Sequence, residues 1–393
     1  MIDNKNIVFV YAIALLIALP PFAIDTYMPS FGNIALSMNV SVSLLPISIT
    51  AYFIGYGIGV FIWGSLSDRY GRKKILTIGV LTFIIATSLC LLTNNFLIFK
   101  FLRLIQGLSG SSTGIIAMAI IRDYYQGKEL TKKMATINSI MMGAPLLAPI
   151  IGSAMMHYFK IWESIFVFLL CYGALLLIIT LQLKESIKQK TQNKIIDLKL
   201  YTVHLKNKKF VLLSIIPGLS FASYFVFIGN SSVLLISFFH LSQFEYSFFF
   251  ALNIFVSLIA QQILKKIVDR YKASNIIITC LTVALCGNIL AFSFSHYVVN
   301  IYAFSLSITL ICGSLSPIGT ICASNAISAV KESFGTANAL SRLFSFSMAG
   351  LATFVSSMFY GIDLMKAINL QQLCIISLII IIIFYNLKSK HLS

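Results

Sequence analysis

Long apolar segments alternate with short polar ones along the whole chain. A helix that crosses a bilayer needs roughly 20 apolar residues, and twelve stretches of the sequence approach or exceed that length. They run approximately over residues 7–29, 44–64, 75–93, 96–119, 134–156, 162–183, 210–229, 246–264, 275–294, 299–323, 335–359 and 370–386. The pattern predicts an all-α polytopic membrane protein with twelve transmembrane helices.

A polar interval divides this pattern in the middle. Residues 184–209 carry eight lysines and only two acids. The string LSDRYGRKK at 66–74 returns as IVDRYKASN at 267–275, each time after the second span of its half. Two related halves are typical of secondary transporters. We therefore expect a six-helix bundle over 1–183, a basic cytoplasmic linker over 184–209 and a second six-helix bundle over 210–393.

The charged residues support a membrane protein and define its topology. The chain is 58% hydrophobic and 10% charged, with a net charge of +17. A soluble domain of this size exposes far more charge. Of 29 Lys and Arg, 24 lie in the termini and in the loops on one predicted side of the membrane. By the positive-inside rule we expect both termini in the cytoplasm, and we expect no nucleic-acid partner.

The sequence shows no sign of an enzyme or a metal site. All seven cysteines fall within apolar spans without metal-ligand spacing, so we expect small buried side chains and no disulfides. No phosphate-binding loop and no nucleophile–base arrangement is visible. We expect no cofactor. A membrane-embedded enzyme would need a reactive cluster, and a structural subunit would have little use for the charged residues described next.

One carboxylate, Asp25, lies within a predicted span, in the string ALPPFAIDTYMPS. Such a group is costly in a bilayer and usually faces an aqueous cavity. We expect Asp25 to bind and release a proton or cation; the alternative is an interfacial carboxylate at the outer end of the first helix. Pro21 and Pro29 flank it and are expected to bend the helix and free backbone carbonyls.

Arg103 is the second charge that we place in a span, in FLRLIQGLSGSSTG. A guanidinium stays charged, so it must find an anion, water or carbonyl groups. The neighbouring Gln106 adds a polar group, and glycines at 107, 110 and 114 allow close helix contact. We expect Arg103 to face the cavity and to couple to the proton site. The alternative is a packing seam with an arginine that reaches the interface.

Two other helical regions carry candidate residues. In the span 134–156, Pro145, Pro149 and Gly152 lie on one helical face, which favours a kinked helix that moves against its neighbour over one that is merely bent. An aromatic cavity suits bulky lipophilic compounds, and cationic ones in particular. Ordinary packing is the alternative for most of the 32 phenylalanines. The candidate lining residues are Tyr27, Gln106, Tyr224, Phe225 and Asn253.

The tight reversal GSLSDRYGRKK at 64–74 combines small residues, cations and one acid. The glycines permit the turn, and the cations hold it on the cytoplasmic side. The positive-inside rule accounts for the cations but not for the carboxylate of Asp68, which therefore needs another explanation. The residues concerned are Gly64, Asp68, Arg69, Gly71, Arg72 and Lys73.

These strings together resemble the major facilitator superfamily. The turn at 64–73 matches its loop signature, Arg103-Leu-Ile-Gln106-Gly107 looks like its fourth-helix motif, and Ala148-Pro149-Ile-Ile-Gly152 looks like its antiporter motif. Three further strings, at 23–29, 121–123 and 334–337, resemble the bicyclomycin/chloramphenicol-resistance branch of this superfamily.

The resemblance implies proton-coupled drug efflux by alternating access across the bacterial inner membrane, with a monomer sufficient for the task. It implies that Asp25 carries the proton, that Arg103 couples it to transport, and that Asp68 with its arginines forms a cytoplasmic latch. Uptake or exchange of a small metabolite on the same scaffold is the alternative function. A channel is the less favoured mechanism, because the two-half plan and the latch-like turn favour alternating access.

Overall fold

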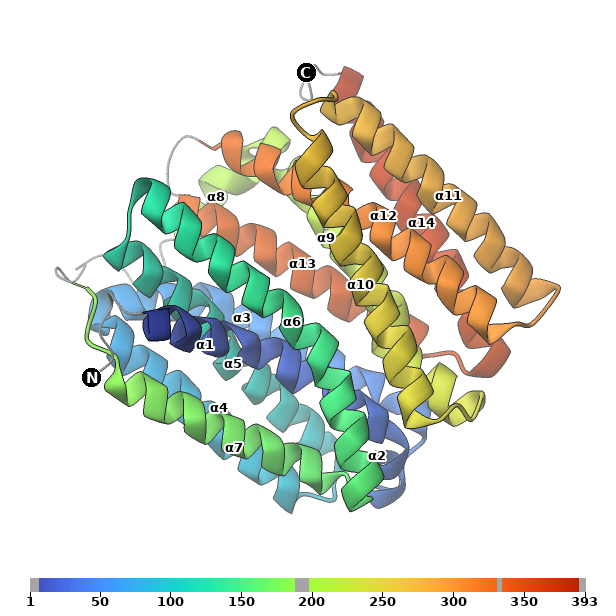
Figure 1. Ribbon diagram of the computed structural model, residues 1–393, viewed down its shortest axis with the longest axis horizontal. Coiled ribbons are helices and arrows are strands. Elements are labelled where there is room, and N and C mark those ends of the chain that lie inside the picture. Colours follow the sequence, from blue (N-terminus) through green and yellow to red (C-terminus); the bar gives the residue numbers. More distant parts are fainter. Residues whose placement is uncertain (1–6, 188–197, 331–333, 389–393) are drawn as a thin grey trace. The chain divides into compact units, whose positions relative to one another are not determined.

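The computed structural model describes residues 7–187, 198–330 and 334–388, and these are almost entirely helical (Figure 1). No strand occurs in these ranges. Eleven segments are long and apolar enough to cross a membrane. The twelfth spanning helix is α6 (Gly127–Phe159), whose 33 residues reach about 50 Å at 1.5 Å per residue, so its polar first turns can extend beyond the hydrocarbon. The predicted twelve-helix fold is confirmed.

The described chain divides into two compact units. Unit 1 takes in the described residues up to 40 and from 51 to 187; unit 2 takes in residues 41–50 and the described residues from 198 onward. The elements before the division are α1 (Ile7–Asp25), the 3₁₀ turn η1 (Met28–Ser30), α2 (Phe31–Ser37), the 3₁₀ turn η2 (Val42–Leu44), α3 (Pro46–Tyr70), α4 (Arg72–Leu92), α5 (Phe96–Tyr124), α6 and α7 (Glu163–Gln182).

The helices of unit 2 follow the same long, apolar plan. They are the short α8 (Leu198–Lys206), α9 (Lys208–Ser232) with its π-helical turn η3 (Val233–Phe238), α10 (Gln243–Ile267), α11 (Ala273–His296), α12 (Ile301–Ser328), α13 (Phe334–Ser356) and α14 (Gly361–Lys388). The α8 helix lies within the stretch expected as a linker and is held to α13 by a bond between His204 Nε2 and Thr336 Oγ1 of 2.9 Å.

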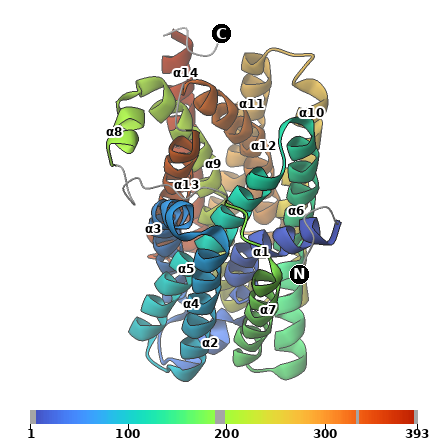
Figure 2. The same cartoon turned by 90° about the vertical axis from the view of Figure 1, so that its left-hand side faces the viewer.

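Helix α5 is a packing centre of unit 1. It lies against α1 and α4, and α4 lies between α5 and α7 (Figures 1 and 2). Gly107 of α5 and Gly55 of α3 each meet the partner helix directly, since a Cβ atom at either would overlap a backbone carbonyl of the other helix. Without these glycines α3 and α5 would have to separate.

Helix α9 has the corresponding place in unit 2, packed against α12, α13 and α14. Figure 1 shows α11, α12 and α14 side by side in orange and red. Asn288 of α11 and Asn369 of α14 each donate to the other's backbone carbonyl, at 3.2 and 3.1 Å. Such paired amides satisfy buried polar groups between helices.

Two expectations from the sequence need correction. The first helix does not continue through residue 29: it passes both Pro20 and Pro21 but ends at Asp25, and η1 follows. The cysteines are all free, but Cys171, Cys286 and Cys374 are exposed rather than buried. Their positions are on the outward faces of apolar helices, where composition alone does not separate a lipid-facing side chain from a core side chain.

The α3–α5 contact generates a stability prediction. Gly107→Ala should lower the melting temperature of the purified protein, because the new methyl group overlaps the Tyr52 carbonyl and overpacking costs ~1–3 kcal/mol. Gly32→Ala in α2 is the matched control, since a Cβ there has nothing within 4 Å. Thermal unfolding in detergent measures both variants; equal melting temperatures would show that the contact does not limit stability.

Candidate functional site

The guanidinium of Arg103 is fully buried in unit 1, with 0% of its surface exposed. It donates from one terminal nitrogen to Gln106 Oε1 at 2.7 Å and from the other to the Ala23 carbonyl at 3.0 Å. Its Cζ lies 4.2 Å from the ring centroid of Tyr27 and 4.9 Å from that of Tyr52. Two aromatic faces and two oxygen acceptors therefore stabilise the positive charge in place of a carboxylate.

A hydrogen-bonded chain leads from Arg103 into α4. Gln106 accepts from Arg103 and donates through Nε2 to Thr87 Oγ1 at 2.7 Å, and Thr87 donates to the Phe83 carbonyl at 2.7 Å. Each member is buried. The chain fixes which way the Gln106 amide points, because its oxygen is needed by the arginine and its nitrogen by the threonine.

Asp25 is the last residue of α1 and is 6% exposed. Its Oδ1 has no hydrogen-bond partner among the described residues, and no ion pair joins Asp25 to Arg103. The Ala23 carbonyl that binds Arg103 lies only two residues earlier. Asp25 and the cationic Arg103 are therefore linked through the backbone of α1 rather than by direct contact.

Tyr52 belongs to the same site, although the sequence analysis did not select it. It is fully buried, and its ring centroid lies 4.9 Å from Cζ of Arg103. Its hydroxyl has no hydrogen-bond partner in the described part of the chain, and neither has the Nε of Arg103. Buried polar atoms without partners are uncommon in proteins. Their gathering here marks a place where a proton or a polar group of a ligand can bind.

The antiporter-like helix α6 meets α1 at this site. A Cβ atom on Gly152 would overlap the carbonyl of Thr26, the residue after Asp25. The helix continues through Pro145 and Pro149 without a break. The structure thus brings Gly152 against the point where α1 ends, while a Cβ on Gly143 of the same helix would have open space around it.

A second polar cluster joins four segments of unit 1 around Arg72. This arginine is 9% exposed; it pairs with Asp68 of α3, donates from Nε to Asp123 of α5 at 3.1 Å, and donates to Ser67 Oγ at 2.7 Å. Ser186, which follows α7, donates to Asp123 at 2.6 Å. Asp68 and Arg72, selected from the sequence, therefore lie together, and Asp123 is the partner that joins them to α5.

The backbone at position 71 lies in the left-handed region, which is why this turn needs glycine. Gly71 has a φ of +109°, and a Cβ there would come within 2.6 Å of Glu185 Oε2. The same carboxylate accepts from the backbone N–H groups of Arg72 and Lys73 at 2.8 and 3.2 Å. It thereby caps the start of α4, where an anion is stabilised by the helix dipole.

The remaining residues of the turn have separate environments. Arg69 lies over the ring of Tyr70 at 5.5 Å, and Lys73 Nζ donates to the Leu181 carbonyl at 2.6 Å. A Cβ on Gly64 would make only an ordinary contact, at 3.7 Å from Ile115. The turn cluster of Ser67, Asp68, Arg72, Asp123 and Ser186 therefore does not include the side chain of Arg69, whereas the Gly64 carbonyl accepts from Ser67 Oγ at 2.8 Å.

The candidate cavity residues fall into two groups. Tyr27 and Gln106 both contact Arg103 in unit 1. Tyr224, Phe225 and Asn253 belong to unit 2. There Asn253 donates to Thr309 Oγ1 at 3.4 Å, and its Oδ1 has no partner among the described residues.

Gln372 is a fully buried amide of unit 2 that was not predicted from the sequence. Gln372 accepts from Ser223 Oγ at 2.7 Å and donates to the Ser223 carbonyl at 2.9 Å. Cys312 donates to the same carbonyl at 3.5 Å. The available signal was an amide pair, Gln371 and Gln372, inside an apolar span. Arg342, a cation inside the predicted span 335–359, was also missed, and its side chain is exposed in unit 2.

No group of three or more metal-ligating side chains occurs in the described ranges.

The family model described as Major Facilitator Superfamily matches residues 9–361. The bicyclomycin resistance protein homolog of Haemophilus influenzae is 24% identical over 397 residues, covering 100% of this chain and 98% of that protein. The multidrug resistance protein MdtL of Escherichia coli O45:K1 is 29% identical over 302 residues, 77% of this chain and 76% of its own length.

Solved structures show the same fold at low sequence identity. The D-xylose-proton symporter matches with a TM-score of 0.71 and 16% identity, covering 96% of this chain and 97% of its own. The nucleoside transporter NupG, as a D323A mutant, matches with a TM-score of 0.70 and 14% identity, covering 97% and 98%.

The contact between α6 and the end of α1 generates a prediction for transport. Gly152→Ala should strongly reduce transport with the protein still in the membrane, because the new methyl group pushes α6 away from Thr26. Gly143→Ala in the same helix should leave transport unchanged. Substrate flux in vesicles with matched protein amounts measures both. Equal flux in the two variants would remove Gly152 from the site.

The turn cluster generates a second prediction. Arg72→Gln leaves Asp68 and Asp123 without their shared cation and removes the charged hydrogen bonds that join α3, α4 and α5. We expect turnover to fall about ten-fold, the effect of ~1.4 kcal/mol on a barrier. Arg69→Gln, which removes a charge outside the cluster, is the control. Turnover is measured at saturating substrate; a normal rate in Arg72→Gln would contradict a role of the cluster in the transport cycle.

Proposed function

The chain belongs to the major facilitator superfamily, and we propose that it exports lipophilic compounds in exchange for protons by alternating access. As a member of that family it is a multi-pass inner-membrane protein that carries small molecules and is not an enzyme. The direction of transport, the coupling ion and the class of substrate are the parts that we propose.

The observation that carries proton coupling is the buried carboxyl of Asp25 with an unpartnered oxygen. In such a place the group exists either as a neutral acid or as a carboxylate with a cation, water or substrate beside it. A substrate that arrives at this end of α1 changes which form is stable. Substrate binding and proton binding then become alternatives, which is the requirement for exchange in opposite directions.

Arg103 supplies the coupling between the acid and the rest of unit 1. It binds the α1 backbone two residues from Asp25 and also reaches Gln106. A change in the charge of Asp25 alters the field at the guanidinium, which is held by aromatic faces and carbonyl groups rather than by an anion. We propose that this arginine responds by shifting between the α1 carbonyl and the carboxylate.

The side chains of unit 2 favour an uncharged or weakly polar substrate surface. The buried charged residues in the described ranges are Asp25, Arg72 and Arg103, all in unit 1. Unit 2 instead buries amides, hydroxyls and phenylalanines. Charged nutrients need charged partners, whereas lipophilic drugs need aromatic and apolar contacts. The names of the two drug-resistance relatives agree with this choice.

Uptake or exchange of a small polar metabolite is the second candidate. The amide oxygens of Asn230 and Asn253 in unit 2 are buried without partners among the described residues, and two such acceptors could bind hydroxyl groups of a metabolite. Metabolite uptake would use the same scaffold with inward substrate movement, so direction and substrate class separate the two proposals.

The topology and the cycle complete the proposal. By the positive-inside rule both termini and the turn cluster lie in the cytoplasm. The turn cluster would act as a latch that holds one conformation and opens in the other. The two six-helix halves, 1–183 and 210–393, would be the two domains that move during the cycle, and one chain is sufficient for it.

Inverted vesicles with a pH-sensitive dye test proton exchange directly. When a lipophilic cation or neutral antibiotic is added to energised vesicles, we expect proton efflux from the lumen, seen as dequenching. Asp25→Asn should abolish the response while the protein stays folded in the membrane. Asp363→Asn, which changes a carboxylate that is 76% exposed, is the matched control and should respond like the wild type.

Two outcomes would contradict the proposal. Full dequenching in Asp25→Asn would remove this residue as the proton carrier. No response to any lipophilic compound, together with proton movement on addition of polar metabolites to right-side-out vesicles, would replace efflux by metabolite uptake.

A further inference from the structure

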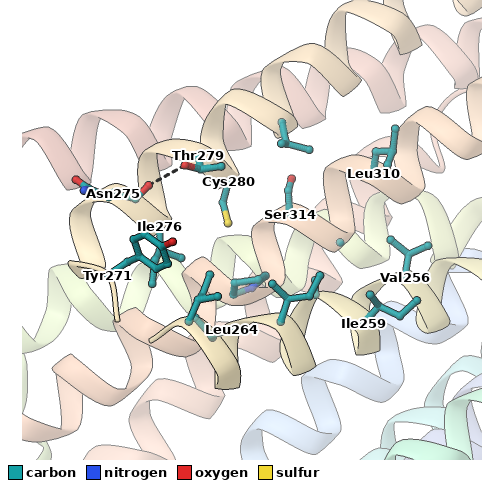
Figure 3. Close-up of a pocket in the computed structure, with 16 residues that line it drawn as sticks. Val256, Ile259, Leu264, Tyr271, Asn275, Ile276, Thr279, Cys280, Leu310 and Ser314 are labelled. Carbon is teal, nitrogen blue, oxygen red and sulfur yellow. Dashed lines mark hydrogen bonds between the residues drawn. The ribbon is translucent and has the colours of Figure 1, made fainter. Parts of the chain in front are cut away.

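An apolar groove lies between α10 and α11 of unit 2, with α12 as its floor; we call it the α10–α11 groove. Its volume is about 490 Å³, and its walls include Val256, Ile263, Ile267, Val283 and Leu310. Figure 3 shows Val256 and Leu310 at one end and Tyr271 and Asn275 at the other. The wall residues Ile263 and Val283 are 51% and 42% exposed, so the groove opens to the surface of its unit.

The helix packing explains why the groove exists. Both α10 and α11 pack on α12. Gly313 of α12 faces Val256 of α10, where a Cβ would come within 2.8 Å of the valine, and Gly287 lets α11 approach α12 in the same way. The two outer helices are thus each held against α12, and the short chain of Val268–Lys272 joins them at one end. The space that remains between them is the groove.

The length of the groove matches one leaflet of a bilayer. Its wall on α10 runs from Val256 to Ile267, which is about 17 Å of helix at 1.5 Å per residue. The hydrocarbon core is ~30 Å thick, so this wall covers about half of it. A single acyl chain from one leaflet fits this length, whereas a helix of a second protein would cross both leaflets.

The polar end of the groove is basic. Four exposed cations and one exposed carboxylate, Asp269, lie in the segment 265–272, which also carries the lining residues Ile267 and Tyr271; the cations are Lys265, Lys266, Arg270 and Lys272. Tyr271 and Asn275 add a hydroxyl and an amide to the same end. Basic groups at the membrane surface attract anionic lipids. The other end, at Val256 and Leu310, lies within the apolar helices.

We propose that the α10–α11 groove binds an anionic phospholipid, with one acyl chain against α12 and the phosphate at the basic end. The match has two parts: an apolar trough of one-leaflet length and a cluster of cations where the headgroup would lie. The site is separate from Asp25 and Arg103, which belong to unit 1. The proposal therefore stands whether or not the chain exports drugs.

Native mass spectrometry of the purified full chain measures lipid binding directly. We compare phosphatidylglycerol with phosphatidylcholine of the same acyl chains, and we expect the anionic lipid to bind at least about ten-fold more tightly, because each cation adds attraction near the surface. Lys265→Gln/Lys266→Gln/Arg270→Gln should bring the two lipids to equal affinity. Lys206→Gln/Lys208→Gln/Lys209→Gln, which removes three cations elsewhere in unit 2, should keep the preference.

A second variant tests the apolar part. Ser314 of α12 points into the groove (Figure 3), and Ser314→Phe should reduce binding of both lipids by filling the trough. If Ser314→Phe does not fold, the triple variant Lys265→Gln/Lys266→Gln/Arg270→Gln still tests lipid binding, because it changes only exposed side chains. Equal affinities of the wild type for the two lipids, or a preference unchanged in the charge variant, would overturn the proposal. A dimer that Ser314→Phe abolishes would identify a second copy as the occupant instead.

Discussion

The burial of one permanently charged guanidinium is the constraint on which unit 1 depends. Arg103 is enclosed completely, and an unpaired charge in such a place would cost several kcal/mol. Helices α1, α3, α4 and α5 together offset this cost with a carbonyl, two aromatic rings and an amide held in place by a threonine. The glycines that bring α3 onto α5 are needed because Tyr52 must come close to the arginine.

The same arrangement leaves Asp25 available for exchange. Because the terminal nitrogens of Arg103 donate to neutral oxygens, the carboxyl at the end of α1 is not committed to an ion pair. Helix α1 ends at Asp25, and Gly152 of α6 packs against the next residue, Thr26. A movement of α6 would therefore displace the backbone beside the Asp25 carboxyl. Unit 2 buries no Asp, Glu, Lys or Arg among its described residues, and we propose that it offers apolar and weakly polar surface to the substrate.

The sequence predicted the twelve helices, and it selected Asp25, Arg103, Asp68 and Arg72, because charge in an apolar span and cations in a tight turn are visible as composition. It did not predict their partners. Tyr52, Thr87 and Asp123 become neighbours of these residues only through helix packing, and Gln372 meets Ser223 across 149 positions of sequence. The end of α1 at Asp25 was also missed, since the apolar pattern continues to residue 29.

In the proposed cycle, substrate and proton compete at Asp25. Purified protein in weakly buffered detergent, titrated with tetraphenylphosphonium while pH and binding heat are followed, shows whether they do. We expect release of about one proton per substrate bound, with substrate binding favoured as pH rises. Binding with normal heat and no proton release would contradict it, because the site would then hold substrate without displacing the proton.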